Sequence, residues 1–282
     1  MEYSNNPTVT ILQTDNRIND EMVKLSIKIN HNACVSLNYE YNFMNIIDIL
    51  NKYKVNPCHT FDKYKFLIAK LYSVYDLLEK CETDFIIFLD TDAWIQEKYY
   101  LNDLINKLHV SNLNGAFSRD PYVKDATFIN SGSFILKVND YNKNMYKNII
   151  NEYQLANKKN YLNDHNFILD KNDTNDNFKK VFGDQYFISY YVFNNKKDFL
   201  IFKPTVLNTP DGVVLRHHWW KHIKLYSDAN TILKDDYIFK RDTFNFDENL
   251  DYEQYPCSVE QNATNMYCSP METIVKYGFS LV

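Results

Sequence analysis

Apolar runs alternate with stretches of helical spacing along the first half of the chain. The run "DFIIFLD" (residues 84–90) is apolar without alternation, which is typical of a parallel strand buried on both faces. The order of elements predicts an α/β fold with a mainly parallel sheet flanked by helices. Strands are expected at residues 8–15, 34–42 and 84–90, and helices at residues 18–33, 43–54, 61–80 and 97–110, with Asn19 or Asp20 capping the first helix.

The second half of the chain continues this pattern and then becomes irregular. Residues 157–180 are polar and lack a period, which predicts a mobile loop. We expect one domain at residues 1–225 and an irregular C-terminal extension at residues 226–282 that packs on it. The other expected elements are a strand–turn–strand at residues 126–138 broken at Ser131-Gly132, helices at residues 141–157 and 184–194, and strands at residues 198–207 and 211–224.

Charge and composition exclude several classes of protein. The 282 residues carry a formal net charge of −5 with no long basic run, so a nucleic-acid partner is not expected. No apolar stretch approaches 18 residues and no signal-peptide pattern is seen, which predicts no membrane span in this chain and a cytoplasmic location, lumenal only if an anchor is missing. The five cysteines are odd in number and form no CxxC pair, as in a reduced intracellular protein. The oligomeric state stays open.

Two acids, Asp90 and Asp92, follow the apolar strand directly. Residues two apart on an extended chain point the same way, so both carboxylates can face one point at the carboxyl end of the strand. Ligands bind at that edge in open α/β sheets. Two close carboxylates repel unless a cation or proton separates them, and hard oxygen ligands favour Mn²⁺ or Mg²⁺. The sequence therefore predicts a divalent metal that bridges the protein and a diphosphate.

Two classes of enzyme use such a strand end. Haloacid-dehalogenase-like phosphatases have the motif D-x-D-x-T/V, and at its fifth position, counted from the first acid, this chain has Trp94. Their later Gly-Asp motif is echoed by Gly183-Asp184, but the second acid expected four residues on is replaced by Ile188. Sugar-nucleotide transferases of the GT-A fold have the same strand end deeper in the chain, which fits here.

The chain resembles the retaining GT-A galactosyl-, mannosyl- and xylosyltransferases of fungi and plants, a group that includes xyloglucan xylosyltransferases. The resemblance covers roughly residues 8–224, and its motifs are weak singly but specific in their order. These motifs are "SIKINHNACVSLNYEY" (residues 26–41), "FDKYKFLIAKL" (residues 61–71), "FIIFLDTDA" (residues 85–93), "INSGSFILK" (residues 129–137), Asp184-Gln185, and "VVLRHHWWK" (residues 213–221).

The resemblance implies a metal site of Asp90, Asp92 and one histidine of "HHWWKH". Strand alternation allows only one of His217 and His218 to face the acids, and the position in the motif favours His217. The family has a glycine shortly after this histidine, whereas this chain has Trp219 and Trp220.

The resemblance also implies donor-binding and catalytic residues. Asp184 and Gln185 would lie beneath the anomeric carbon, where a carboxylate stabilises an oxocarbenium-like state. Asp184 is also well placed to cap a helix. The implied donor-binding residues are Thr14, Tyr39, Lys63, Asp90, Asn130, Ser131, Gly132 and Lys221.

We therefore expect a Mn²⁺- or Mg²⁺-dependent glycosyltransferase. It would transfer a sugar from a nucleoside diphosphate donor, with UDP as the default, to a hydroxyl of a glycan or glycoconjugate acceptor, with retention of configuration. The alternatives are a metal-dependent phosphatase and a non-catalytic sugar-nucleotide or glycan-binding protein of the same fold. The donor sugar, the acceptor and the linkage stay open.

Overall fold

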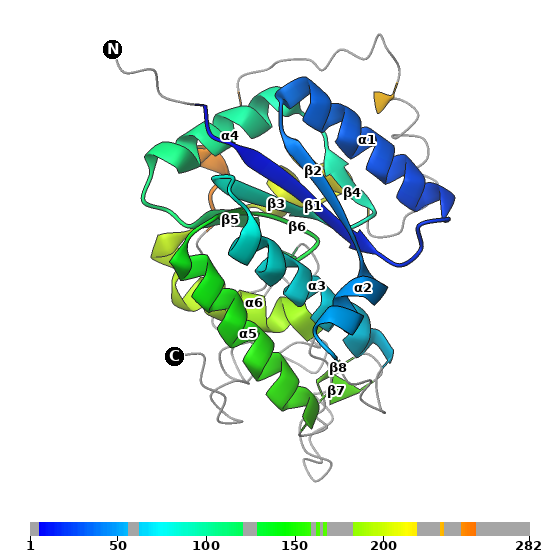
Figure 1. Cartoon of the computed structure of the whole chain (residues 1–282). Coiled ribbons are helices and arrows are strands. Elements are labelled where there is room, and N and C mark those ends of the chain that lie inside the picture. Colours follow the sequence, from blue (N-terminus) through cyan, green and yellow to red (C-terminus); the bar gives the residue numbers. More distant parts are fainter. Residues whose placement is uncertain are drawn as a thin grey trace, which may run out of the picture.

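A six-stranded sheet between two layers of helices forms the centre of the protein (Figure 1). This computed structural model describes residues 6–55, 62–120, 129–158, 162–163, 166–167, 183–218, 232–233 and 244–251. No helix among the described residues combines the length and the apolar character needed to cross a bilayer.

The sheet has the strand order β2-β1-β3-β6-β5-β9. Five of these strands run in the same direction and only β6 is antiparallel to its neighbours, which confirms the expected mainly parallel sheet. The strands are β1 (Val9–Asp15), β2 (Glu40–Asn45), β3 (Phe85–Leu89), β5 (Gly115–Ser118), β6 (Ser133–Lys137) and β9 (Leu200–Phe202).

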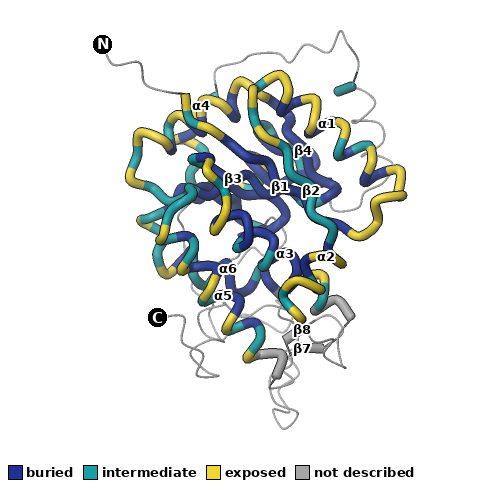
Figure 2. The backbone as a smooth tube through the Cα atoms, viewed as in Figure 1, coloured by how far each residue is buried: buried dark blue, intermediate teal, exposed yellow. Residues whose placement is uncertain are grey.

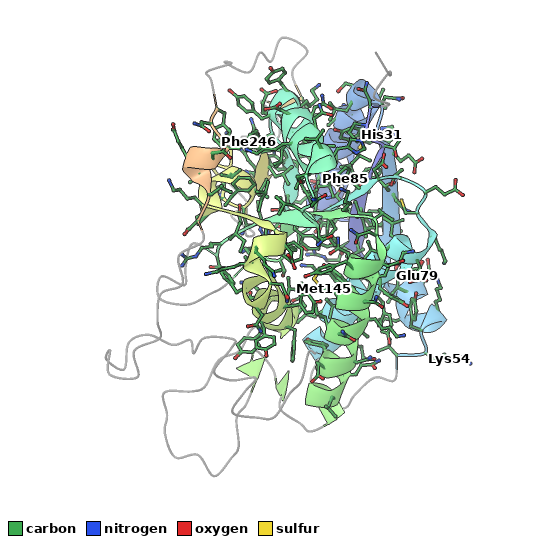
Figure 3. All side chains as sticks on the ribbon, turned by 90° about the vertical axis from the view of Figure 1, so that its left-hand side faces the viewer. His31, Lys54, Glu79, Phe85, Met145 and Phe246 are labelled. Atoms are coloured by element: carbon green, nitrogen blue, oxygen red, sulfur yellow. The ribbon has the colours of Figure 1, made fainter. Side chains whose placement is uncertain are left out.

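Side-chain alternation along the strands divides the core into two clusters. In β3, Ile86 and Phe88 face the cluster under α3 (Asp62–Lys80), α5 (Asp140–Lys158) and α6 (Gly183–Asn194). Phe85, Ile87 and Leu89 face the opposite cluster, which α1 (Glu21–Leu37) and α4 (Lys98–Val110) cover. All five residues of β3 are buried, as the continuous apolar run indicated (Figure 2). Three of the side chains labelled in Figure 3 belong to these clusters: Met145 to the first, and Phe85 and Phe246 to the second.

The strand expected at residues 34–42 is wrong at its start. Asp20 caps α1 as expected, but the helix continues to Leu37, because Ala33 and Cys34 extend its buried stripe. Asn38 then ends it in the left-handed conformation, which asparagine tolerates better than most residues. The strand therefore begins only at Glu40.

Two further boundaries differ from expectation for local reasons. Asn45 is the last residue of β2 and caps α2 (Ile46–Lys52), so the helix expected from residue 43 starts later. The strand expected at residues 198–207 stops at Phe202, because Pro204 begins the short helix α7 (Pro204–Leu207).

Two small antiparallel ladders complete the described structure. One pairs β4 (Ala93–Ile95) with β10 (Leu215–His217). Of the strand expected at residues 211–224, residues 211–218 are described, and only Leu215–His217 form a strand. The other pairs β7 (Leu162–Asn163) with β8 (Asn166–Phe167), inside the loop expected at residues 157–180. Most of that loop, and Trp219, Trp220 and Lys221, lie outside the described residues.

The described part of the C-terminal extension packs on the main domain. Phe246 contacts Phe202 of β9, and the Asp251 carboxylate pairs with Arg119 at 3.1 Å. The domain boundary near residue 225 stays a prediction, since residues 219–231 lie outside the described structure.

Candidate active site

Polar side chains gather at the carboxyl ends of the parallel strands. β1, β2, β3 and β5 all end at this edge, and the turn before the antiparallel β6 reaches the same place. A pocket of about 550 Å³ opens here. It is lined by residues 14–17 at the end of β1, residues 90–92 after β3, Ile46 of α2, and Phe66, Leu67 and Lys70 of α3. A larger hollow of about 730 Å³ lies between α4 and residues 244–248, away from Asp90, Asp92 and His217. Because Asp90 and Asp92 line the pocket at the sheet edge, that pocket is the candidate active site.

Asp90, Asp92 and His217 form the one cluster of metal-ligating side chains found among the described residues, with ligand atoms all within 4.8 Å of one another. His217 Nε2 lies 3.1 Å from Asp92 Oδ1 and 3.8 Å from Asp90 Oδ2. The ladder of β4 with β10 creates this approach, because it places His217 opposite Ala93. In addition, the His218 amide donates to the Asp92 carbonyl at 2.9 Å.

The two adjacent histidines point to different places, as strand alternation requires. His217 faces the acids, whereas the buried ring of His218 stacks on Trp94 with 4.1 Å between ring centroids. Trp94 is itself fully buried and packs with Met22 and Ile29. The tryptophan that separated this sequence from the phosphatases is thus a core residue, and His217 is the histidine beside the acids.

Gly132 lies directly against His217. A Cβ atom at Gly132 would overlap the imidazole ring, so any larger residue would displace it. The Gly132 carbonyl also accepts a hydrogen bond from the Asp90 amide at 2.7 Å. Gly132 therefore leaves room for the His217 ring while its carbonyl holds the Asp90 amide.

Lys70 of α3 is a site residue that the sequence did not indicate. Its ammonium lies 3.1 Å from Asp90 and 3.4 Å from Asp184, and it donates to Ser131 Oγ at 3.3 Å. Its side chain is 10% exposed. The available signal was a lysine in line with the buried Val74 and Leu77, four and seven residues further along α3.

Burial and neighbouring charges act in opposite directions on the pKa values of Asp90, Lys70 and His217. Burial is the largest effect on Asp90 and raises the pKa of its carboxyl despite the nearby Lys70. Burial disfavours the charged form of Lys70, but Asp90 and Asp184 outweigh it and raise the pKa of the ammonium. Burial likewise opposes a charged His217, yet Asp92 and Asp90 raise the pKa of its imidazole above the usual value. Lys70 and His217 thus lie among the acids at the place where a divalent ion would also offset carboxylate charge.

Asp120, at the end of the β5 segment, joins two of the expected residues. Its Oδ2 accepts hydrogen bonds from Asn130 Nδ2 at 3.1 Å and from Gln185 Nε2 at 2.8 Å. Asn130 Oδ1 in turn accepts from the Gly132 amide at 2.8 Å. Asp120 has no sequence motif around it, so only the fold reveals it.

The turn of Asn130, Ser131 and Gly132 connects the parts of the site. Ser131 Oγ donates to Asp184 Oδ2 at 3.1 Å and accepts from Lys70. Through these bonds and through Asp120, the structure brings the turn together with Asp184 and Gln185 beside Asp90, as the sequence predicted.

Of the other expected donor-binding residues, one lines the pocket, one lies away from it, and two have side chains outside the described structure. Thr14 lines the pocket. Tyr39 lies at the amino end of β2, on the edge of the sheet opposite the acids, where its hydroxyl donates to Asn102 of α4 at 3.3 Å. The structure does not bring Tyr39 to the site. Lys63 is on α3 but its side chain is outside the described structure, as is all of Lys221.

Arg17 and Asp15 form a second polar wall of the pocket. Arg17 Nη2 lies 2.7 Å from Asp15 Oδ2, and the Thr91 hydroxyl donates to the same oxygen at 2.6 Å. Burial would raise the pKa of Asp15, but its bonds to Arg17 and Thr91 outweigh this and lower it. The hydrogen bond from Thr91 to Asp15 thereby joins the turn between Asp90 and Asp92 to the end of β1.

Comparison with solved structures identifies the fold. The sequence matches no protein-family model and no curated protein. In structure it is similar to a glycosyltransferase involved in the glycosylation of the major capsid of the virus PBCV-1, with a TM-score of 0.54 and 15% identity over 80% of this chain and 98% of that chain.

Two more distant matches are mouse xyloside xylosyltransferase 1 and the glycosyltransferase GlyE of Streptococcus pneumoniae TIGR4. The first has a TM-score of 0.44 and 12% identity over 80% of this chain and 92% of that one. The second has a TM-score of 0.46 and 9% identity over 82% and 61%. The assignment rests on the viral protein and on the sheet: this chain has a GT-A-like glycosyltransferase fold.

Proposed function

We propose that the protein is a metal-dependent glycosyltransferase that moves a sugar from a nucleoside diphosphate donor, with UDP as the expected nucleotide, to a hydroxyl of a glycan acceptor. The observation that carries this proposal is the position of Asp90, Asp92 and His217. They lie at the carboxyl edge of a GT-A-like sheet, beside a 550 Å³ pocket, with Asp184 joined to Asp90 through Lys70.

The three side chains fit a divalent cation. Ligands at about 2.1 Å from an octahedral ion lie about 3 Å apart when adjacent, and His217 Nε2 is 3.1 Å from Asp92 Oδ1. Two carboxylates with one imidazole suit Mn²⁺ better than Mg²⁺, because Mg²⁺ prefers oxygen alone. Three protein ligands would leave the remaining positions for diphosphate oxygens. When bound, such an ion supplies positive charge to the departing diphosphate.

Lys70 would place one positive charge between two acids of the site. It pairs with Asp90, a proposed metal ligand, and with Asp184, which the proposal places next to the donor sugar. The Asp184 carboxylate would stabilise positive charge that develops on the sugar. Gln185 Nε2 is engaged with Asp120, so the amide has Oε1 as its second polar atom for the donor.

Following the resemblance to the retaining transferases, we propose that the new bond forms on the face that the diphosphate leaves. The bond between the anomeric carbon and the phosphate oxygen breaks, and a bond to the acceptor oxygen forms. The acceptor's proton passes to the leaving phosphate oxygen, so no separate base is needed. Asp90, Asp184 and Gln185 hold the donor; Lys221 and Lys63 stay candidates for phosphate or sugar contacts.

A thermal-shift screen of nucleotide sugars with and without Mn²⁺ tests the proposal. A donor-specific stabilisation that requires Mn²⁺ is expected, since a ligand that binds only the folded state raises the melting temperature. Release of the nucleoside diphosphate from the selected donor then measures turnover. Tight binding without turnover on any acceptor would indicate a binding protein. Phosphate release from phosphomonoesters without any response to UDP would indicate the phosphatase.

A further inference from the structure

The ring of His217 is held through the nitrogen that does not face the acids. Nδ1 of His217 lies 2.7 Å from Oδ1 of Asn208, and the two residues are 6% and 0% exposed. An amide oxygen only accepts hydrogen bonds, so Nδ1 carries a proton and donates it. In the neutral ring, Nε2 then has its lone pair directed to the side of Asp92 and Asp90.

Asn208 is itself fixed by the sheet. The preceding residue, Leu207, donates its amide to Ser118 Oγ at 3.1 Å, and its carbonyl accepts a hydrogen bond from Ser133 Oγ. Both serines are fully buried in central strands. The following residue, Thr209, accepts the His217 amide through its carbonyl at 3.2 Å. Asn208 and His217 are thus held relative to each other by backbone as well as by side chain.

The second polar atom of Asn208 gives an independent reason to assign it a role. Among the residues that the structure describes, none accepts a hydrogen bond from the buried Asn208 Nδ2. Burying an amide N–H without an acceptor destabilises a fold, and a leucine of similar volume would avoid that loss. The amide is present despite this cost, which indicates that the site needs Oδ1.

We propose that Asn208 is a positioning residue of the metal site: it holds His217 as the Nδ1–H form and orients Nε2 toward the cation. This inference rests on the proposed metal-dependent function and extends it to a residue that touches neither the ion nor the donor. Partners of this kind typically contribute about 10- to 100-fold to metal affinity. Removing Oδ1 should therefore weaken Mn²⁺ binding by about that factor while the acids stay in place.

The test compares the Mn²⁺ affinity of the 282-residue chain with that of its variants, measured by paramagnetic resonance of the free ion. Asn208→Ala should weaken binding about 10- to 100-fold, and Asn208→Asp, which keeps an acceptor oxygen, should restore it. Asn142→Ala is the matched control, because Asn142 is also 0% exposed but lies on α5. Asn208→Leu removes Oδ1 but keeps a side chain of similar volume, so it replaces Asn208→Ala in the test if the alanine variant does not fold.

A second readout does not depend on affinity. In protein loaded with diamagnetic Zn²⁺, wild type should show a slowly exchanging His217 Nδ1–H in the imidazole ¹⁵N spectrum, and Asn208→Ala should lose it. Wild-type Mn²⁺ affinity in Asn208→Ala, with affinity lost in His217→Ala, would overturn the role of Asn208 and leave the proposed function standing. Equal and weak Mn²⁺ binding by wild type and His217→Ala would overturn the metal site itself, and the inference with it.

Discussion

The imidazole of His217 occupies the space that a side chain at position 132 would fill, so Gly132 and His217 are sterically matched. We predict that Gly132→Ala lowers Mn²⁺ affinity and destabilises the protein by about 1–3 kcal/mol, the usual cost of overpacking. Isothermal titration with Mn²⁺ and chemical denaturation measure the two effects. Unchanged metal affinity in a folded Gly132→Ala protein would show that His217 does not need this contact.

Asp92 is predicted to be indispensable for turnover but not for folding. Asp92→Ala should abolish metal-dependent donor hydrolysis and transfer, since it removes one ligand and the partner of His217 at 3.1 Å. The circular dichroism spectrum should stay that of wild type. Asp103→Asn on the exposed face of α4 is the matched control and should retain activity. Full activity of Asp92→Ala would remove the basis of the assignment.

Lys70 should be coupled energetically to Asp184. Lys70→Met leaves the buried Asp184 carboxylate without its cation, and breaking such a buried pair typically costs about 3–5 kcal/mol. Asp184→Asn should recover part of that loss, so the double variant should be more stable than the sum of the single variants implies. Urea denaturation of the four proteins in the cycle measures the coupling. Strict additivity would contradict the pairing.

Asp120 is predicted to act on transfer and not on metal binding. It accepts hydrogen bonds from Asn130 and Gln185 but is outside the cluster of metal-ligating side chains. Asp120→Ala should lower kcat by about 100-fold, because misplacing a positioning group can cost that much, while Mn²⁺ affinity stays the same. Parallel loss of both properties would place Asp120 in the metal site instead.

Asp76 gives a pH-dependent contribution to stability that is separate from the site. It lies on α3 and is 7% exposed; Lys52, Lys80 and the Tyr53 hydroxyl bind its carboxylate. Burial would raise the pKa of Asp76, but these partners outweigh burial and lower it below its usual value. A lowered folded-state pKa adds stability above the unfolded pKa of about 3.9, and this stability disappears as the pH falls through the folded-state value.

Asp76→Asn tests this relationship. Wild type should be more stable than the variant near neutral pH, and the difference should shrink as the pH is lowered below about 4. Denaturation midpoints at several pH values measure the difference. A difference that stays constant down to pH 2 would mean that the carboxylate charge is not what stabilises the contact.

Local patterns in the sequence were sufficient to predict the acids but not all of their partners. The apolar run of β3 places Asp90 and Asp92 at a sheet edge, because burial and strand direction follow from pattern alone. Pattern does not set the phase of a three-residue strand. The position in the motif favoured His217, and the pairing of β10 with β4 places that histidine beside the acids.

Residues that act across the fold were harder to predict. Lys70 is on an otherwise apolar helix face. Asp120 contacts Gln185, which is 65 residues away in sequence, and Asn208 contacts His217 only because the chain turns back between α7 and β10. Tyr39 was misplaced because α1 continues to Leu37, which moves the start of the next strand to Glu40 and leaves Tyr39 at the wrong edge.

The ladder of β4 with β10 also has a consequence for synthesis. Asp90 and Asp92 leave the ribosome well before His217, and the chain grows at about 5–20 residues per second. His217, the third residue of the proposed metal site, is therefore made last. Because β10 both supplies His217 and pairs with β4, the chain would complete the proposed site and close that ladder in one event. The proposed metal site would then be complete only in chains whose translation has passed β10. Chains that end before β10 would lack His217 and would not compete for Mn²⁺ or donor.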